Sequence, residues 1–210
     1  DLGYIIAGYT FSDDGDVGFN IGNRDFWVLK INANGGIEWS KVFGGSQRDE
    51  AYSVWQTNDD GFVISGFVES GDGNVSENKG VKDVWVIKLN ELGDLVWEKS
   101  LGGSLNEVAF SVRQISFGGI LLTGYTESND GDISNFKGSS DYWVIMLNGF
   151  GELLWEKTYG GSLTDWGYFI DELDDESFLI SGYSDSDDLD KSVAYGDIDY
   201  WVLKLSLIHI

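Results

Sequence analysis

One motif recurs along the chain at a constant spacing of 58 residues, and this repetition constrains the fold more than any other feature. Residues 26–46 read FWVLKINANGGIEWSKVFGGS, residues 84–104 read VWVIKLNELGDLVWEKSLGGS, and residues 142–162 read YWVIMLNGFGELLWEKTYGGS. A fourth copy begins at position 200 with YWVLKLS. A fixed period indicates one supersecondary unit that is repeated in space. We therefore treat residues 1–210 as a single domain, with repeat units near 1–49, 50–107, 108–165 and 166–210.

Each unit is predicted to contain four short strands separated by turn residues. In the second unit these segments, which we call A to D, are Ala51–Thr57, Phe62–Val68, Asp83–Asn90 and Leu95–Leu101. Asn-Asp-Asp-Gly follows segment A and Glu-Leu-Gly-Asp follows segment C, and both are typical turn sequences. A long polar loop joins segments B and C. No segment keeps a helical period, which argues against a helical solenoid.

The side-chain patterns of the four segments predict their places in a sheet. Segments B and C are apolar on both faces, as expected of strands that are covered on both sides. Segment D alternates and repeats a lysine at positions 41, 99 and 157, which suits an outer edge strand. Segment A carries small residues such as Ala51 and Ser53, which suit a crowded inner strand. An inner strand, two middle strands and an outer strand describe one blade of an all-β, antiparallel β-propeller.

The number of segments predicts an incomplete ring. The first unit lacks segment A and the last lacks segment D, so the chain holds about 3.5 four-stranded blades. An open arc leaves apolar blade faces in contact with water. We therefore expect either further blades in the natural protein or association between chains to close the ring. The tail Leu207–Ile210 departs from the repeat, and because the chain begins at Asp1, inside a repeat unit, we expect it to be a piece of something longer.

Composition argues against several classes of function. The chain has no Cys, so neither a disulfide framework nor a thiolate metal site can form. The single histidine, His209, stands at the end of the chain, which argues against His-based catalysis and zinc binding. No apolar run approaches 18 residues, so we predict no membrane insertion. The net charge of −23 predicts repulsion from nucleic acid and anionic lipid and attraction to cations or basic partners.

The acidic residues gather in the loops between segments B and C. Three copies share Asp-Gly-Asp/Asn followed by an apolar residue, at 14–17, 72–75 and 130–133, while Leu189 replaces the Gly in the fourth copy. Carboxylate and amide oxygens around a Gly turn are ligands that Ca²⁺ prefers, although the spacing is not that of an EF-hand. The alternative is an Asp-Gly turn braced by local hydrogen bonds. The candidate calcium ligands are Asp14, Asp16, Asn20, Asp25, Asp72, Asn74, Asn78, Asp83, Asp130, Asp132, Asn135, Asp141, Asp188 and Asp190.

Two further sets of repeated residues are interpreted as structural. One acid follows each Gly-Gly-Ser at the connection from segment D to the next segment A, and we expect it to accept backbone N–H groups of that turn. These acids are Asp49, Glu107 and Asp165. Seven tryptophans recur in the apolar strands, where packing between blades is a better explanation than sugar stacking. They are Trp27, Trp39, Trp85, Trp97, Trp143, Trp155 and Trp201.

One position of segment A breaks the repeat. It holds Trp55, Arg113 and Asp171 in successive units, and the strand direction places it at the end of the inner strands opposite the acidic loops. A repeat protein that varies one inner position can shape an asymmetric ligand pocket. The alternative is that a solvated channel mouth simply tolerates any side chain at this position.

The repeated motif resembles a known family. The pattern A-x-S-V-x-Q-T, G-F-x-I-x-G, D-x-W-V-x-K-L-N and W-x-K-x-x-G-G-S is similar to the bacterial β-propeller repeat known as the SBBP repeat, and it is carried by residues 83–90 and 97–104 and their copies. This resemblance covers nearly the whole chain and implies a secreted or cell-surface protein with a binding or scaffolding role. It implies no catalytic residue.

Three functions are compatible with these observations. The first is a non-enzymatic extracellular binding or scaffold module with calcium in its acidic loops and a protein or carbohydrate ligand. The second is a carbohydrate-active enzyme, which would use paired carboxylates, or a lectin. The third is a structural spacer in a larger surface protein. The acids recur with the repeat whereas an active site is unique, so we expect that the protein is not an enzyme.

Overall fold

The computed structural model of the protein describes residues 2–191 and 196–206, and within these ranges all regular elements are β-strands. The tail Leu207–Ile210, including His209, lies outside the described residues. The described residues form fourteen strands, whose positions repeat along the chain. Their bounds are β1 (Tyr4–Thr10), β2 (Asp25–Ile31), β3 (Ile37–Phe43), β4 (Asp49–Gln56), β5 (Phe62–Val68), β6 (Asp83–Leu89), β7 (Leu95–Leu101), β8 (Glu107–Gln114), β9 (Ile120–Thr126), β10 (Asp141–Leu147), β11 (Leu153–Tyr159), β12 (Asp165–Glu172), β13 (Ser177–Ser184) and β14 (Asp199–Ser206).

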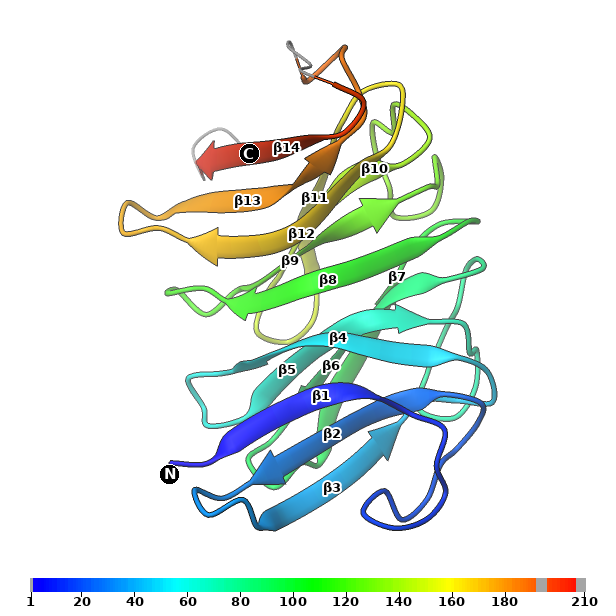
Figure 1. Ribbon diagram of the computed structural model, residues 1–210, viewed down its shortest axis with the longest axis vertical. Helices are drawn as coiled ribbons and strands as arrows, with labels where there is room; N and C mark the ends of the chain where they lie inside the picture. The colour runs from blue at the N-terminus through cyan, green and yellow to red at the C-terminus, as the bar shows by residue number, and fades with distance from the viewer. Residues whose placement is uncertain (1, 192–195, 207–210) are drawn as a thin grey trace.

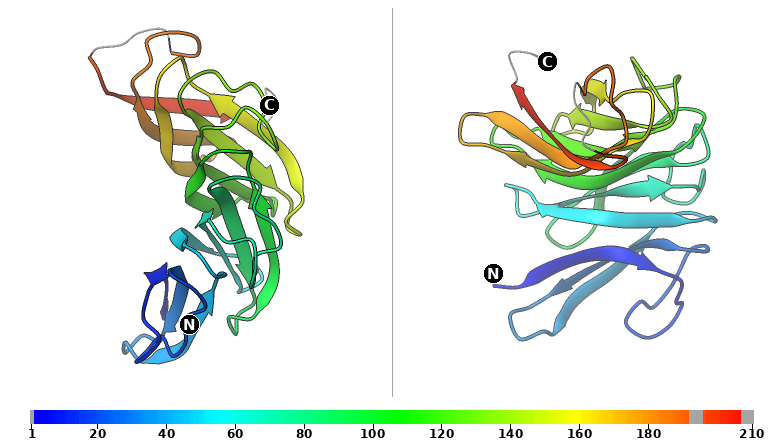
Figure 2. Two further views of the ribbon diagram at one scale, coloured as in Figure 1. Left: turned by 90° about the vertical axis from the view of Figure 1, so that its right-hand side faces the viewer. Right: turned by 45° about the horizontal axis from the view of Figure 1, so that its top comes forward.

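The strands form four antiparallel sheets that follow the sequence order. The first sheet is β1-β2-β3, the second β4-β5-β6-β7, the third β8-β9-β10-β11 and the fourth β12-β13-β14. The sheets lie one after another along a curved arc, with the first and fourth at its two ends (Figures 1 and 2). The predicted all-β architecture is confirmed, and among the described residues the first sheet has no segment A strand and the fourth has no segment D strand, as predicted.

Each strand takes the place that its side chains predict. The strands of segments B and C, β5-β6 and β9-β10, lie in the middle of their sheets and are buried along their whole length. The lysine-bearing segment D forms an outer edge. Segment A begins two residues earlier than predicted, at Asp49, because its ladder with β5 already starts with Asp49 paired to Val68. Segment C ends at Leu89, one residue earlier than predicted.

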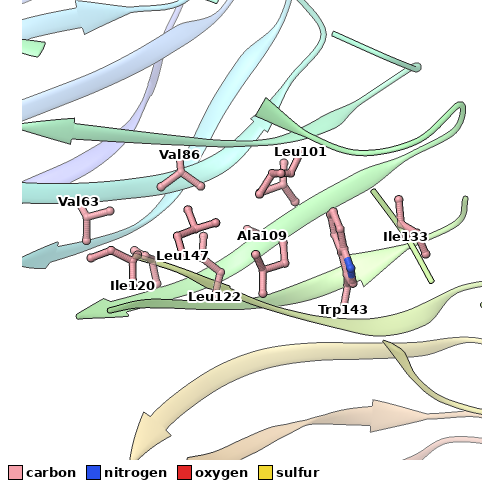
Figure 3. Packing of buried hydrophobic residues seen from close by; sticks show 12 residues of the cluster. Val63, Val86, Leu101, Ala109, Ile120, Leu122, Ile133, Trp143 and Leu147 are labelled. Carbon is pink, nitrogen blue, oxygen red and sulfur yellow. The ribbon is translucent and has the colours of Figure 1, made fainter. Parts of the chain in front are cut away.

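The apolar core lies between neighbouring sheets. At the middle junction Val86 and Leu101 of the second sheet pack against Leu122 and Trp143 of the third (Figure 3). Equivalent clusters join the first sheet to the second and the third to the fourth. Trp85 and Trp143 are fully buried at these junctions, which confirms the predicted core role for these two tryptophans. Each sheet therefore depends on its neighbour to cover one apolar face.

The outer strands and the following turns also connect neighbouring sheets. The indole Nε1–H of Trp39 donates to the carbonyl oxygen of Glu91, and that of Trp97 donates to Gly149, both at 3.2 Å. Both indole rings are only partly buried and pack against the core clusters. In the part of the chain that the structure describes, no helix is long and apolar enough to cross a membrane.

Candidate functional site

The inner strands β4, β8 and β12 lie side by side and form one continuous surface along the arc (Figure 1). Serine hydroxyls connect them: Oγ of Ser53 accepts the N–H of Val112 at 3.1 Å, and Oγ of Ser111 accepts the N–H of Ile170 at 3.4 Å. A larger side chain at either serine would separate the strands. The small residues of segment A therefore have the packing role that the sequence predicts.

A β-bulge in each inner strand places an aromatic residue on this surface. The pairing of each inner strand with its neighbour skips one residue, which is Tyr52 in β4, Phe110 in β8 and Tyr168 in β12. A bulge re-aims the side chain of the unpaired residue. The rings of Tyr52 and Phe110 lie 5.6 Å apart, and those of Phe110 and Tyr168 lie 4.8 Å apart. We call these three residues the aromatic row; the sequence interpretation missed them, although their shared repeat position is a signal.

The variable position of segment A converges on one pocket beside the aromatic row. Trp55, Arg113 and Asp171 come from three different sheets, yet all three line a single cavity of about 360 Å³. Phe110 and Tyr168 of the aromatic row complete its wall. The long acidic loops lie at the other ends of the strands, on the opposite side from the turns that follow the inner strands (Figure 1). The structure thus brings together the three residues that the broken repeat singled out.

Charge and aromatic contact are combined at the centre of this pocket. The guanidinium carbon of Arg113 lies 4.7 Å from the ring centroid of Trp55, within cation–π distance, and the same side chain forms an ion pair with Asp171. The Nε of Arg113 is buried and has no hydrogen-bond acceptor among the described residues. Trp55 remains more than one-third exposed. The pocket therefore offers an exposed ring, a cation and a carboxylate to a ligand.

The acidic loops contact the Gly-Gly-Ser turn of the preceding sheet. The N–H of Ser46 donates to Oδ1 of Asp72 at 2.7 Å, and the N–H of Gly44 donates to Oδ1 of Asn74 at 3.2 Å. We call this pair of hydrogen bonds the clasp. Clasps recur from Ser104 to Asp130 (2.8 Å), Gly102 to Asp132 (3.0 Å), Ser162 to Asp188 (2.8 Å) and Gly160 to Asp190 (3.1 Å).

The clasp persists where the loop sequence changes and is missing where no sheet precedes it. Leu189 adopts a left-handed backbone with a φ of 56°, so the fourth loop keeps the turn without a glycine. In the first loop Asp14 and Asp16 are exposed, because the first sheet has no preceding turn to contact. The hydrogen bonds of these acids are therefore a property of the junction between two sheets.

The other predicted calcium ligands are dispersed within each loop. Asp25, Asp83 and Asp141 begin the strands of segment C, which are β2, β6 and β10, and each accepts a backbone N–H of its own loop, from Gly22, Lys79 and Lys137 at 2.7–2.9 Å. The amide oxygen of Asn78 accepts the N–H of Gly80 at 3.0 Å. The amide groups of Asn20 and Asn135 instead donate, to the carbonyl of Gly22 and the hydroxyl of Ser134.

These contacts bear directly on the predicted calcium sites. Asp132 and Asp190 each accept a lysine ammonium as well as a backbone N–H, from Lys79 at 2.6 Å and Lys137 at 2.7 Å. Within residues 2–191 and 196–206, no group of three or more acidic or histidine side chains is placed so that it could hold a metal ion. Calcium binding by these loops stays a prediction, and the clasp gives the acids a separate structural role.

Buried carboxylates meet in pairs next to the first glycine of each Gly-Gly-Ser turn. A Cβ on Gly102 would lie 2.5 Å from Oδ1 of Asp83 and 2.8 Å from Oε2 of Glu107, so only glycine fits between them. Both acids are fully buried, and Oδ1 of Asp83 has no hydrogen-bond partner among the described residues. Burial raises the pKa of Asp83 and of Glu107, and the nearby Asp83 carboxylate raises the pKa of Glu107 further.

The predicted anchoring role of these acids is confirmed. Oε2 of Glu107 accepts the N–H of Gly103, and the equivalent oxygens of Asp49 and Asp165 accept those of Gly45 and Gly161, all at 2.8 Å. In the third unit Asp141 occupies the position of Asp83. Burial raises the pKa of Asp141 to about 6, and the Asp165 carboxylate contributes in the same direction.

Comparison with other proteins does not assign the chain to a family. No protein-family model matches the sequence, and no curated protein matches it. The functional conclusion therefore rests on the pocket between the inner strands and on the aromatic row beside it.

Proposed function

We propose that the four sheets are blades of a β-propeller of the SBBP-repeat type, and that the chain is a non-enzymatic binding module of a secreted or cell-surface protein. The observation that carries this proposal is the convergence of Trp55, Arg113 and Asp171 on one cavity of about 360 Å³. Cavities of about this volume can hold a small ligand or one residue of a polymeric ligand. Three neighbouring copies of a repeat position differ here, as a unique site on a repetitive scaffold requires.

The chemistry of the cavity favours a carbohydrate as its ligand. Exposed aromatic rings supply an apolar surface for the face of a sugar ring, while a guanidinium and a carboxylate supply hydrogen bonds to hydroxyl groups. Trp55 and Tyr168 provide such rings, and the paired Arg113 and Asp171 provide the polar groups. The aromatic row extends the same surface toward the first sheet. A peptide with an aromatic side chain is the second candidate, because the same rings would accept it.

A binding role suits this cavity better than glycoside hydrolysis does. Hydrolysis of a glycosidic bond requires two carboxyl groups on opposite sides of the bond. Asp171 is the one carboxylate among the described residues that line the cavity, and it is already paired with Arg113. The paired carboxylates of the chain lie at the other ends of the strands, where they are buried among backbone N–H groups.

An oligosaccharide array and fluorescence titration test this function. We expect the wild-type chain to bind a subset of the array, and the bound sugars to change tryptophan emission because Trp55 lies in the cavity. Trp55→Ala and Arg113→Ala should each weaken binding by about tenfold or more, which corresponds to about 1.4 kcal/mol. Phe150→Ala is the matched control, because Phe150 is an exposed aromatic residue in the turn between β10 and β11. Binding that survives both cavity substitutions would refute the proposal.

A further inference from the structure

The fourth sheet exposes side chains that every other sheet covers. Phe26, Val84 and Tyr142 share one repeat position and are at most 1% exposed, whereas Tyr200 at the same position is 95% exposed. Two residues further along each strand, the three internal valines are fully buried, whereas Val202 is 55% exposed. In the first three sheets these side chains face the next sheet along the arc. The face of the fourth sheet that carries Tyr200 and Val202 is therefore uncovered, whereas the equivalent face of each earlier sheet packs against the next sheet.

The junction between the third and fourth sheets shows what this face packs against. The ring of Tyr142 lies 4.9 Å from that of Trp201 in the next sheet, and its hydroxyl donates to the carbonyl oxygen of Trp201 at 3.0 Å. Space for the hydroxyl exists because residue 182 is a glycine, whose Cβ would lie 2.6 Å from it. Tyr142 thus fits a Gly–Trp pair on adjacent strands of the following sheet, where Gly182 and Trp201 are ladder partners.

The first sheet exposes the complementary face, which is the equivalent of the face that receives Tyr142 in the fourth sheet. Gly8 and Trp27 occupy the repeat positions of Gly182 and Trp201, and they are ladder partners on β1 and β2. A Cβ on Gly8 would have no atom within 4 Å, so the space that receives a tyrosine at the last junction is open here. Tyr4 and Ile6 of β1 are also largely exposed, whereas their equivalents Phe62 and Ile64 are buried at an internal junction.

We propose that two copies of this chain associate head to tail, with Tyr200 of one copy seated on Gly8 and Trp27 of the other. The two exposed faces match because the same pair of faces already packs three times within the chain. This proposal rests on the repeated junction and is independent of the carbohydrate site. The contact is heterologous, so copies will form either a closed ring or an open chain.

Charge and the missing strands limit the strength of this contact. Among the described residues the first sheet has no segment A strand and the fourth has no segment D strand, so the new junction lacks contacts that the internal ones have. A net charge of −23 on each copy repels another copy at low ionic strength. Salt shortens the range of this repulsion to about 10 Å at 0.1 M, while the apolar contact remains. We therefore expect association that strengthens with protein concentration and with salt.

Analytical ultracentrifugation of end-blocked variants tests the proposal. Wild-type chain at about 100 µM in moderate salt should sediment as dimers or larger species, and at about 1 µM as monomers, as expected for a micromolar dissociation constant. Gly8→Val fills the receiving space, and Tyr200→Asp places a charge on the opposite face. Each variant alone should remain monomeric. An equimolar mixture should form heterodimers and no larger species. The Gly8→Val copy keeps an intact Tyr200 face and the Tyr200→Asp copy keeps an intact Gly8 face, so one junction can form and the two remaining faces are blocked.

Phe150→Asp changes an equally exposed aromatic residue away from both end faces and should leave association unchanged. Circular dichroism spectra of all variants should match the wild type, since Gly8 and Tyr200 contact little in one copy. A wild-type chain that stays monomeric at 100 µM and high salt would overturn the proposal. So would self-association of either blocked variant alone, which would indicate a symmetric contact or a different surface.

Discussion

The middle junction and the two ends of the arc place the same repeat residues in opposite environments. Between the second and third sheets, Val86 and Trp143 are fully buried and the clasp connects loop to turn. At the ends, Val202 is largely exposed, Trp27 is partly exposed, and Asp14 has no turn to contact. The side chains at these particular repeat positions are similar in kind in all the units. The difference teaches that burial and polar contacts in this chain are set by the neighbouring sheet, as in other repeat proteins.

Truncation of the repeated tryptophan should give the largest contrast between the two regions. Trp143→Ala removes a fully buried indole and its 2.8 Å hydrogen bond to Glu156, so we expect a loss of about 3–5 kcal/mol in the free energy of unfolding. Trp27→Ala removes a partly exposed indole at the first sheet and should cost about half as much or less. Urea denaturation at about 1 µM protein measures both. Equal losses would contradict the dependence on a covering sheet.

The strand glycines give a second contrast. A Cβ on Gly124 would lie 1.7 Å from the carbonyl oxygen of Val108, so Gly124→Ala forces the strands apart and should destabilise the protein by about 1–3 kcal/mol. A Cβ on Gly8 meets no atom within 4 Å, so Gly8→Ala should change stability by about 0.5 kcal/mol or less. Thermal unfolding of the two variants is the measurement. A destabilising Gly8→Ala in the monomer would show that this face is already covered.

The carboxylate pairs should make internal units sensitive to pH. Burial raises the pKa of Asp141 to about 6, from 3.8 when unfolded, so its contribution is fully present below pH 3.8 and is lost as pH rises through 6. Asp141→Asn should therefore stabilise the protein at pH 8, by about 2 kcal/mol, and have little effect at pH 4. Chemical denaturation at the two pH values checks this. A substitution that destabilises equally at both would show that the carboxylate is not strained by burial.

A surface carboxylate supplies the matched control for that pH dependence. The hydroxyl of Thr57 and the ammonium of Lys88 hold the pKa of Asp59 down at about 2. Its contribution is present above pH 3.8 and is lost as pH falls through 2, which is the opposite sign. Asp59→Asn should therefore produce no gain in stability at pH 8.

The clasp should give the smallest contrast. Asp130→Ala removes the acceptor of the Ser104 N–H at an exposed position, and we expect a loss of about 0.5–1 kcal/mol. Asp14→Ala, in the loop without a preceding turn, should be neutral. Calcium titration of both variants and the wild type, followed by melting temperature, tests the predicted metal sites at the same time. A calcium-dependent rise that Asp14→Ala abolishes would assign a cation to the first loop.

The sequence was sufficient to predict the strands and their order. Apolar residues on both faces of Phe62–Val68 predict a middle strand, and lysines such as Lys99 predict an edge, because burial on a sheet depends on local pattern. The convergence of Trp55 and Arg113 was also predictable, since equivalent positions of neighbouring sheets lie side by side.

Other parts of the site were not predicted from the alternation of side chains along the strands. The aromatic row was missed because a bulge changes which face Tyr52 and Phe110 occupy, and alternation along a strand does not show a bulge. The partners of Asp72 and Asp130 were missed for a different reason. They are backbone N–H groups 26 residues earlier in the chain, and any sequence offers such groups. Acidic side chains alone therefore did not distinguish a metal ligand from a bond to a neighbouring turn.

Because of the clasp, the Gly-Gly-Ser turn of each repeat depends on the acidic loop of the repeat that follows it in the chain. The amide of Ser46 belongs to the first repeat, yet it is protected by Asp72 of the second, and the amide of Ser104 is protected in turn by Asp130 of the third. Hydrogen exchange at each of these amides should therefore report the opening of the following repeat and not of its own. If the array frays from its carboxyl end, the amide of Ser162 should exchange fastest, that of Ser104 more slowly and that of Ser46 most slowly.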